Sequence, residues 1–197
     1  MTPAVVLAAG RSSRIGTPKA LLTDGEGCRF VSRILATLER AGVDGAVVVV
    51  RAGDWEVSGE VARAAPFATA VENEHPDRGQ LSSLVVGLAA VDRPGIDGVL
   101  VTLVDVPLVR ASTVAALLAR ARAEPAGVIR PAFAGRHGHP VIFPRALFEP
   151  LRHAESAKAV VQQHAALVRD VEVDDAGCVE DVDTPADYAR LFGRPPR

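Results

Sequence analysis

Lysine, cysteine and aromatic residues are scarce in this 197-residue chain. Its two cysteines, Cys28 and Cys178, lie far apart in the sequence, which excludes a disulfide scaffold and favours a reducing compartment. The formal charge of −2 lacks the basic excess that a nucleic-acid coat or a membrane-surface protein needs. No apolar run reaches about 18 residues, and no basic stretch precedes the first apolar run, so we expect neither a signal peptide nor a membrane span. These absences predict a cytoplasmic protein.

Only two of the 22 basic residues are lysine, Lys19 and Lys158, and the other 20 are arginine. This bias is typical of a high-G+C coding sequence, in which arginine replaces lysine wherever the exchange is tolerated. A lysine that persists is therefore a candidate for a role that needs a compact charge on a flexible stem.

The length, the 48% hydrophobic residues and the 23% charged residues are those of one ordinary globular domain. No internal repeat, low-complexity run or long linker divides the chain. We therefore expect a single domain over 1–197. The pattern of elements changes after Pro125, which separates a half at 1–125 from a half at 126–197.

Short apolar runs alternate with segments of helical periodicity in the first half. The predicted strands are 4–8, 46–50, 69–72 and 99–104, and the predicted helices are 30–41, 56–65, 81–91 and 111–123, the last of them capped by Ser112 or by the chain just before it. Strands that are apolar on both faces indicate a parallel sheet covered by helices on each side. The sequence thus predicts a three-layer α/β/α fold with a mostly parallel sheet, whose ligands bind beyond the carboxyl ends of the strands.

The second half has a different pattern. Residues 127–133 and 140–143 are predicted to be extended segments, joined as a hairpin by a glycine-rich turn. Two helices near 145–152 and 156–165, a strand near 168–173 and a closing helix at 185–192 complete the prediction.

The first predicted strand leads into a Gly- and Ser-rich loop, AAGRSSRIGTPKALL, at 8–22. Gly10 has no side chain to block an anion, loop N–H groups can point inward, and Arg11, Arg14 and Lys19 supply positive charge. The segment is neither a dinucleotide fingerprint nor a Walker A loop. An ordinary strand-to-helix turn with exposed arginines is the alternative, but the string as a whole favours phosphate binding.

Two aspartates lie at the ends of predicted elements, in positions that suit a metal. Asp105 ends an apolar strand, and Asp183 precedes the closing helix. Magnesium takes one or two protein carboxylates together with phosphate oxygens and waters, so this pair suffices. Taken alone, Asp105 before a proline is typical of a turn, and Asp183 is typical of a helix N-cap. Their joint occurrence with the loop favours a metal site.

Five segments resemble, in order, the motifs of the MobA-like NTP transferases, and most closely those of the MocA-type molybdenum cofactor cytidylyltransferases. They are LAAGRSSRIGTPKALL, GQLSSLVVGL, LVTLVDVPLV, RPAFAGRHGHPVIF and DVDTPADY. The resemblance spans nearly the whole chain and implies a nucleoside-diphospho-sugar-transferase-like, Rossmann-like fold. It also implies that the half at 1–125 binds the nucleotide and the half at 126–197 supplies an acceptor-binding hairpin and closing elements. The family usually has Asp-Met-Pro where this chain has Asp105-Val106-Pro107, which keeps the carboxylate and the proline.

The resemblance also implies residue roles. Lys19, Arg11 and Asp105 would be catalytic, and Asp105 and Asp183 would hold Mg²⁺, with Mn²⁺ as an alternative. The nucleotide would contact Leu7, Ala8, Ala9, Gly10, Arg11, Ser12, Arg14, Lys19, Gly79, Ser82 and Ser83. The acceptor would contact Gly135, Gly138, His139 and Pro140.

Some of these residues have plainer explanations. Ser82 and Ser83 are also typical of a helix N-cap. The pair His137 and His139 lacks a third ligand for a transition metal. For His139, contact with the acceptor and support of the hairpin both stay open.

The activity that the resemblance implies is transfer of a nucleoside monophosphate from an NTP to the terminal phosphate of molybdopterin or the molybdenum cofactor, with release of pyrophosphate. A molybdenum hydroxylase would then use the product. Cytidylyl-transferring relatives read Leu-Ala-Ala-Gly, as residues 7–10 do here, and the methyl group of Ala9 narrows the pocket, so we expect CTP. GTP, a different small phosphate acceptor, and a non-catalytic nucleotide- or cofactor-binding partner of a hydroxylase are the alternatives. Neither nucleic acid nor a membrane is expected as a partner.

Overall fold

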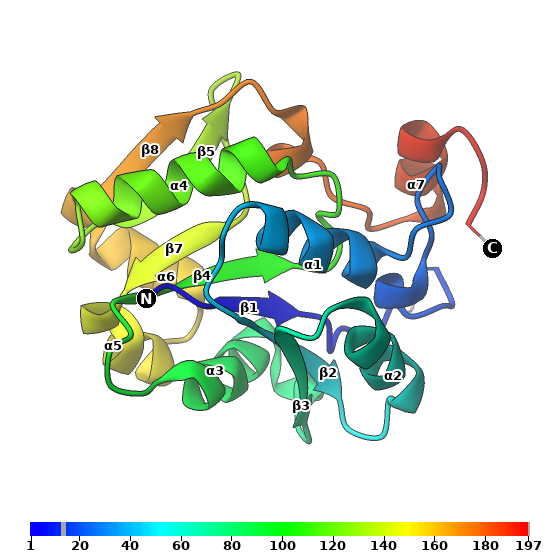
Figure 1. Cartoon of the computed structure of the whole chain (residues 1–197), viewed down its shortest axis with the longest axis horizontal. Coiled ribbons are helices and arrows are strands. Elements are labelled where there is room, and N and C mark those ends of the chain that lie inside the picture. Colours follow the sequence, from blue (N-terminus) through cyan, green and yellow to red (C-terminus); the bar gives the residue numbers. More distant parts are fainter. Residues whose placement is uncertain (13–14, 197) are drawn as a thin grey trace.

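The apolar runs of the sequence form one eight-stranded sheet, with helices packed on both of its faces (Figure 1). The computed structural model describes residues 1–12 and 15–196. Its strands are β1 (Ala4–Leu7), β2 (Ala46–Arg51), β3 (Ala68–Asn73), β4 (Gly98–Leu103), β5 (Val128–Phe133), β6 (Arg136–His137), β7 (Val141–Pro144) and β8 (Val168–Glu172). Its α-helices are α1 (Phe30–Arg40), α2 (Trp55–Ala64), α3 (Gln80–Val91), α4 (Ala111–Ala123), α5 (Phe148–His153), α6 (Ala157–Gln163) and α7 (Pro185–Phe192). Single 3₁₀ turns include η1 (Lys19–Leu21), η2 (Pro76–Arg78) and η5 (Ala176–Val179).

The order of the strands decides where a ligand can bind. The order is β3-β2-β1-β4-β7-β5-β6, with β8 paired in parallel to β5. The chain leaves β1 toward β2 and β3, then returns to place β4 on the other side of β1, and all of these pairs are parallel. Ligands of open α/β sheets bind at such a switch point, beyond the carboxyl ends of the strands. The loops that follow β1 and β4 therefore lie side by side.

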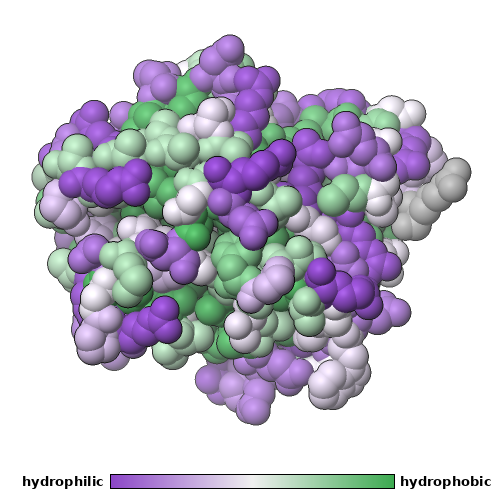
Figure 2. Space-filling model, in the orientation of Figure 1, coloured by the Kyte–Doolittle hydropathy of each residue, from purple (hydrophilic) through white to green (hydrophobic). Residues whose placement is uncertain are grey.

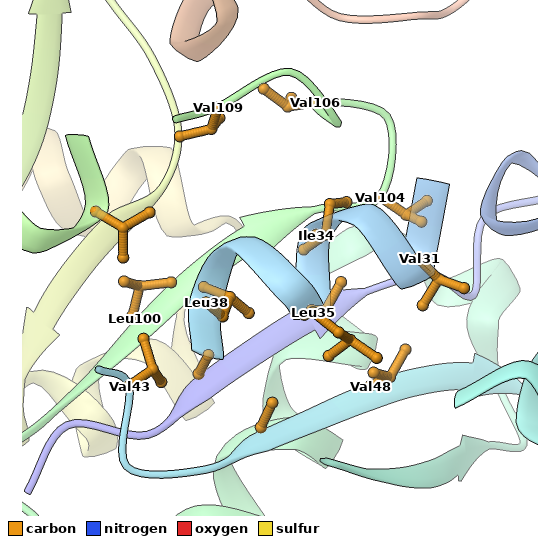
Figure 3. Packing of buried hydrophobic residues seen from close by; sticks show 14 of the residues in the cluster. Val31, Ile34, Leu35, Leu38, Val43, Val48, Leu100, Val104, Val106 and Val109 are labelled. Carbon is orange, nitrogen blue, oxygen red and sulfur yellow. The ribbon is translucent and has the colours of Figure 1, made fainter. Parts of the chain in front are cut away.

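Alternate residues of the strands face two separate hydrophobic clusters. Ala4 and Val6 of β1 belong to the cluster covered by α1, α2 and α4, whereas Val5 and Leu7 belong to the cluster covered by α3, α5 and α6. Figure 3 shows the first cluster, where apolar side chains of α1 that recur every three to four residues pack over the sheet. This alternation explains why the strands are apolar on both faces, and the predicted three-layer, mostly parallel fold is confirmed.

The last helix packs away from the sheet. In Figure 1, α7 lies beside the beginning of α1, at the end of the molecule where β1 and β4 terminate. Its Tyr188 joins Leu22, Phe30 and Val182 in a third apolar cluster. Because Val182 and Asp183 directly precede α7, this small cluster fixes the backbone from which Asp183 projects.

The predicted antiparallel pairing of 127–133 with 140–143 is confirmed, because β5 and β7 are adjacent antiparallel strands, but the sequence predicted neither β6 nor the second partner of β7. Strand β5 turns onto the short β6, and β7 pairs mainly with β4, antiparallel to it, meeting β5 only at Ile129↔Ile142. The apolar β7 thereby pairs along both of its edges, with β4 on one side and β5 on the other, and residues 142–144 are buried. An antiparallel strand thus separates the parallel β1–β4 part of the sheet from β5 and β8.

The structure decides between the alternatives for two helix starts. Ser112 does not cap α4; its N-cap is Arg110, in the chain just before the helix, as the second alternative predicted, and the carboxylate of Asp175 accepts hydrogen bonds from the Arg110 N–H and the Thr113 hydroxyl. Asp183 does not cap α7. That position is taken by Thr184, which forms a capping box with Asp187.

The described surface has few large exposed apolar side chains, namely Met1 and Trp55. On the face shown in Figure 2, hydrophilic and hydrophobic residues are interspersed. None of the helices in residues 1–12 and 15–196 combines the length and the apolar character that crossing a bilayer requires.

Two helical glycines give a matched test of this packing. A Cβ added to Gly87 of α3 would lie 2.4 Å from Val5 Cγ1 under the helix, whereas one added to Gly59 of α2 would meet only the Arg63 guanidinium at 3.9 Å. Gly87→Ala should lower the free energy of unfolding by roughly 1–3 kcal/mol through overpacking. Gly59→Ala should raise it by up to about 1 kcal/mol through helix propensity. Urea unfolding of both variants checks the prediction. If the two substitutions changed the unfolding free energy in the same direction, the close packing of α3 on β1 would be contradicted.

Candidate active site

The loop after β1 is shaped by its own backbone and by one serine. Ser12 has a positive φ of 46°, and its hydroxyl accepts a hydrogen bond of 2.9 Å from the backbone N–H of Lys19. A Cβ added to Gly10 would meet no atom within 4 Å, because the loop faces open space there. The loop thus brings the first turn of η1, and with it Lys19, toward the ends of β1 and β4.

Lys19 lies between the two aspartates that the sequence singles out. Its Nζ is 2.9 Å from Asp105 Oδ2 and 2.5 Å from Asp183 Oδ1. The backbone N–H of Val182 donates to the Asp105 carbonyl at 2.9 Å, which aligns the segment before α7 with the end of β4. Three parts of the chain that are distant in the sequence therefore meet at one ammonium group.

The Lys19 ammonium remains charged in this place. Burial by itself would lower the pKa of Lys19, but the hydrogen bond to Asp183 and the charge of Asp105 outweigh it and raise the pKa above its usual value. One ammonium and two carboxylates carry a formal net charge of −1, so the cluster has room for a further cation.

The two carboxylates fit the needs of a magnesium ion. Within residues 1–12 and 15–196, the buried Oδ1 of Asp105 has no hydrogen-bond partner. A buried carboxylate oxygen without a partner is costly unless a ligand supplies one. The described residues contain no group of three His, Cys, Asp or Glu side chains that could hold a metal. Magnesium, which takes one or two carboxylates and completes its shell with phosphate oxygens and water, suits this donor set.

A cavity of about 390 Å³ opens over this cluster. It lies between the loop after β1 and the start of α3 and is lined by Leu7, Ala8, Ala9, Gly10, Arg11, Ser12, Lys19, Pro76, Gly79, Gln80, Ser83, Leu103, Val104, Asp105 and Asp183. We call it the first cavity. Nearly all nucleotide-binding residues predicted from the sequence line it, and Arg14 lies outside the described residues.

The serines at the start of α3 are held by a residue that the sequence analysis missed. The side-chain amide of buried Asn73, at the end of β3, donates to Ser82 Oγ at 2.9 Å and to Ser83 Oγ at 3.0 Å. Ser82 in turn donates to the carbonyls of Gly79 and His75, and it is not among the residues that line the first cavity. Neither serine is an N-cap, because Gly79, with a φ of 93°, takes that place.

Arg11 also has a partner that the sequence did not reveal. Its guanidinium forms two contacts of 2.8 Å with the carboxylate of Asp77 in η2, and Arg51 lies 3.5 Å from the same carboxylate. These hydrogen bonds and charges hold the pKa of Asp77 below its usual value. The pair links the loop after β1 to the segment before α3.

A second cavity, of about 450 Å³, adjoins the first and shares Leu7, Gly79, Gln80 and Leu103 with it. Its floor is apolar and is made by Leu81, Leu84, Val101, Val141, Phe143 and Val161. Its polar rim comprises Arg78, Arg130, His137, His139, Glu155, Ser156 and Lys158. Gly138 and His139 of the predicted acceptor motif line this cavity, whereas Gly135 and Pro140 do not.

The backbone around His139 is tightly placed. The His139 N–H donates to the Cys178 carbonyl at 2.8 Å, and a Cβ added to Gly138 would lie 1.9 Å from that carbonyl oxygen. Burial lowers the pKa of the His139 imidazole, against the raising effect of the Asp105 charge, so the ring is neutral at physiological pH. Burial also raises the pKa of Cys178 to about 11, which keeps its thiol protonated.

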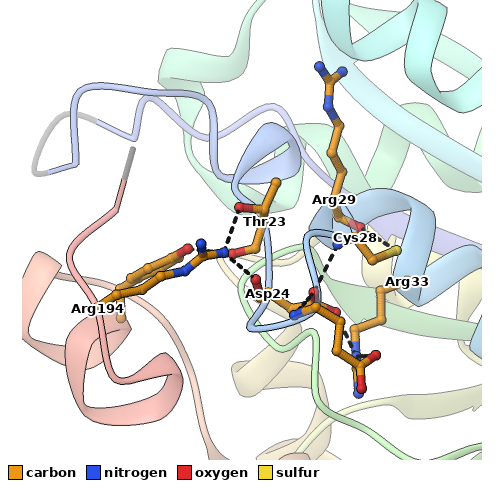
Figure 4. A network of polar contacts seen from close by, with 8 residues as sticks. Thr23, Asp24, Cys28, Arg29, Arg33 and Arg194 are labelled. Atoms are coloured by element: carbon orange, nitrogen blue, oxygen red, sulfur yellow. Dashed lines mark hydrogen bonds and ion pairs between the residues drawn. The ribbon is translucent and has the colours of Figure 1, made fainter.

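A polar network ties α7 to the loop before α1 and so supports Asp183 (Figure 4). The Tyr188 hydroxyl donates to the Thr23 carbonyl, and the Arg194 guanidinium donates to the Asp24 carbonyl at 2.6 Å. The buried Asp24 carboxylate accepts from Arg33 at 2.6 Å and from the backbone N–H groups of Glu26 and Cys28.

Comparison with known proteins gives consistent matches over most of the chain. Residues 4–171 match the model of the MobA-like NTP transferase domain. The chain is similar to a probable molybdenum cofactor guanylyltransferase of Rhodopirellula baltica (29% identity over 95% of this chain and 90% of that one). It is also similar to the purine catabolism protein PucB of Bacillus subtilis (30% identity over 93% of this chain and 92% of that one).

Among solved structures, Rv0371c of Mycobacterium tuberculosis H37Rv matches with a TM-score of 0.80 and 30% identity, over 98% of this chain and all of that one. A second structure of Rv0371c is a complex with manganese, and it matches with a TM-score of 0.72 and 28% identity over 98% of each chain.

The Asp24 network predicts a pH-dependent loss of stability. Burial would raise the pKa of Asp24, but the hydrogen bonds from Arg33 and the two N–H groups outweigh it and lower the pKa. The contribution of Asp24 is therefore complete above its unfolded pKa of about 3.9 and is lost as the pH falls through the lower folded value. Asp24→Asn should cost about 1–3 kcal/mol of unfolding free energy at pH 7. Urea unfolding should show that the difference in unfolding free energy between the parent and Asp24→Asn becomes smaller below about pH 4. An equal difference at pH 7 and below pH 4 would contradict the prediction.

Proposed function

Because this chain belongs to the MobA-like NTP transferase domain family, we propose that it transfers a nucleoside monophosphate, preferably from CTP, to the terminal phosphate of molybdopterin or the molybdenum cofactor. The observation that carries this proposal is the cluster of Lys19, Asp105 and Asp183, which lines the first cavity, next to which the second cavity lies. A nucleotide in the first cavity and an acceptor in the second would meet beside these charges.

In this proposal the two halves of the chain have different tasks. The half at 1–125 supplies the loop and the start of α3, which enclose the nucleotide, while the half at 126–197 supplies His139 and its neighbours for the acceptor. Asp183 is an exception to this division, because it belongs to the second half of the chain but lines the first cavity.

The reaction is an in-line displacement at the α-phosphorus. An oxygen of the acceptor phosphate forms a bond to the α-phosphorus, and the bond between that phosphorus and the bridging oxygen to the β-phosphate breaks. Pyrophosphate leaves with the electron pair, and the product contains a new phosphoanhydride. The protein contributes position and charge, with no covalent enzyme intermediate.

Each charged residue has a task in that step. Lys19 and Arg11 hold the triphosphate, and backbone N–H groups of residues 9–12 face its oxygens. Asp105 and Asp183 would hold Mg²⁺ or Mn²⁺, which when bound supplies charge neutralisation at the reacting phosphates. The manganese complex of Rv0371c supports a divalent ion in this fold.

The choice of base rests on the wall of the first cavity. Ala9 lines the first cavity, at a position where the family resemblance implies glycine in guanylyl-transferring relatives. The extra methyl narrows the space for the base and favours the smaller pyrimidine. GTP is the second candidate, which the name of the Rhodopirellula relative favours.

Pyrophosphate release with CTP, GTP and ATP, each with purified molybdenum cofactor and Mg²⁺, tests the proposal. We expect turnover with CTP to exceed turnover with GTP and ATP. Faster turnover with GTP than with CTP would show that the preferred base is guanine and not cytosine. Pyrophosphate release with none of the three would leave a binding function, and the cofactor assignment would be wrong if only other small phosphates served as acceptors.

The metal assignment predicts a severe defect in Asp105→Asn. Asparagine keeps the size of the side chain but lacks the charge, so turnover should fall at least ~100-fold, which corresponds to about 2.7 kcal/mol of activation free energy. The melting temperature should change little, because the bond from Val182 goes to the backbone carbonyl of residue 105. Near-parental turnover at saturating Mg²⁺ would remove Asp105 from the site, and a large fall in melting temperature would support a turn-forming role.

The phosphate assignment of Lys19 predicts that Lys19→Arg is not conservative. The Lys19 side chain is 14% exposed between two carboxylates, and a planar guanidinium does not fit the position of its ammonium. We expect kcat/KM to fall at least ~10-fold, or about 1.4 kcal/mol, for every NTP, and further in Lys19→Ala.

A matched control for this exchange is Arg122→Lys in the exposed last turn of α4, away from both cavities. It swaps the same two residue types in the opposite direction and should leave the kinetics unchanged. If Lys19→Arg used CTP as well as the parent does, the phosphate role of Lys19 would be wrong.

A further inference from the structure

The second cavity contains the only other lysine of the chain. Lys158 lies in α6 and lines the rim of this cavity. Arginine fills 20 of the 22 basic positions, yet both lysines line the two adjoining cavities. The activity described above uses Lys19 and leaves Lys158 without a task.

The charges around the second cavity are not balanced within the protein. The Arg130 guanidinium is paired with Asp170 at 2.6 Å. Among the described residues, Arg78 and Lys158 form no ion pair, although Glu155 lies three positions before Lys158 on the same rim. Asp77, next to Arg78, is already bound to Arg11 and Arg51. Two unpaired cations therefore face one carboxylate.

Arg78 and Lys158 are exposed on the rim, so an anion can reach both of them from solvent. The floor of the cavity beside them consists of aliphatic and aromatic side chains, on which the uncharged body of a ligand can pack. Lysine presents a compact ammonium on a flexible stem, and it can follow an anion that arginine, with its rigid planar head, would have to meet in one geometry.

We propose that Lys158 binds an anionic group of the acceptor, which is a phosphomonoester, and that Arg78 assists it from the segment before α3. This inference rests on the proposed function for the identity of the acceptor. Lys158 is a binding residue, because it touches the acceptor in the second cavity and not the triphosphate in the first. Its loss should therefore raise the KM for the acceptor and leave the KM for the NTP unchanged.

Steady-state kinetics with CTP and purified molybdenum cofactor make the first test. Lys158→Ala should raise the acceptor KM at least ~10-fold, with the CTP KM and the melting temperature as in the parent. Lys158→Arg keeps the charge, so its acceptor KM should lie between those of the parent and of Lys158→Ala. Arg122→Ala, which removes one exposed positive charge outside both cavities, is the control and should change nothing. An acceptor KM that stays within about twofold of the parent in Lys158→Ala would overturn the proposal, even if the enzyme turns over as proposed.

A second test is independent of turnover. Amine acetylation, mapped by mass spectrometry, reports Lys158 directly, because the side chain is exposed and the chain has one other lysine. The Arg122→Lys variant adds an exposed reference lysine away from both cavities. Molybdenum cofactor, and inorganic phosphate as a simpler probe, should slow acetylation of Lys158 and leave acetylation of the reference lysine unchanged.

Failure of the proposed function and failure of this inference give different results. If pyrophosphate is never released but both probes protect Lys158 selectively, the transfer activity is wrong and the anion site stands. If neither probe protects Lys158 more than the reference lysine, the anion site is wrong, whatever the turnover.

Discussion

The ammonium of Lys19 joins three parts of the chain that the sequence keeps far apart. Its contacts with Asp105 and Asp183 connect the loop after β1, the end of β4 and the segment before α7. Without a cation at this point, two carboxylates would face each other at short range, which is strongly unfavourable in a partly buried site. The position of Lys19 in turn depends on Ser12, which binds its backbone N–H, and the position of Asp183 depends on the small apolar cluster around Tyr188. The packing of α7 against α1 therefore fixes the position of Asp183 in the site.

Much of this arrangement follows from patterns that are local in the sequence. Strands β1, β2 and β4 are short apolar runs, and helix α1 has clear amphipathic periodicity, so both the element types and the parallel part of the sheet could be predicted. A parallel sheet brings the ends of its strands to one edge, and the loop at 8–12 and Asp105 each follow a strand directly. Their proximity is a consequence of topology. The role of Asp183 is harder to predict, because an aspartate just before a helix is typical of an N-cap as well as of a metal site. The structure separates these two explanations, since the N-cap of α7 is Thr184.

The features that the sequence did not reveal depend on contacts between distant residues. Asn73 ends an edge strand, and nothing near it in the sequence indicates that its amide would bind the hydroxyls of Ser82 and Ser83. Asp77 lies in a polar turn, and its pairing with Arg11 arises because that turn faces the loop after β1. The pairing of β7 with β4 is another such case, because the glycine-rich turn indicates the partner β5 on one edge of β7 but not the strand on its other edge. Local patterns specify elements well, but they leave open which partner an element selects.

The antiparallel insertion of β7 has a consequence for the two cavities. It places β5 and β6 beyond β7, so that His139 follows the short β6, sits on a backbone held by the Cys178 carbonyl and lies within range of the Asp105 charge. The parallel part of the sheet builds the first cavity from loops at strand ends, whereas the second cavity lies over the faces of β4 and β7, with α3 and α6 beside it. A cavity over a sheet face has an apolar floor, because residues on that face otherwise pack against helices. A ligand there must be oriented by groups on the rim, and the described side chains on this rim include two cations without an ion pair. This arrangement is the basis for the proposal that the acceptor carries an anionic group.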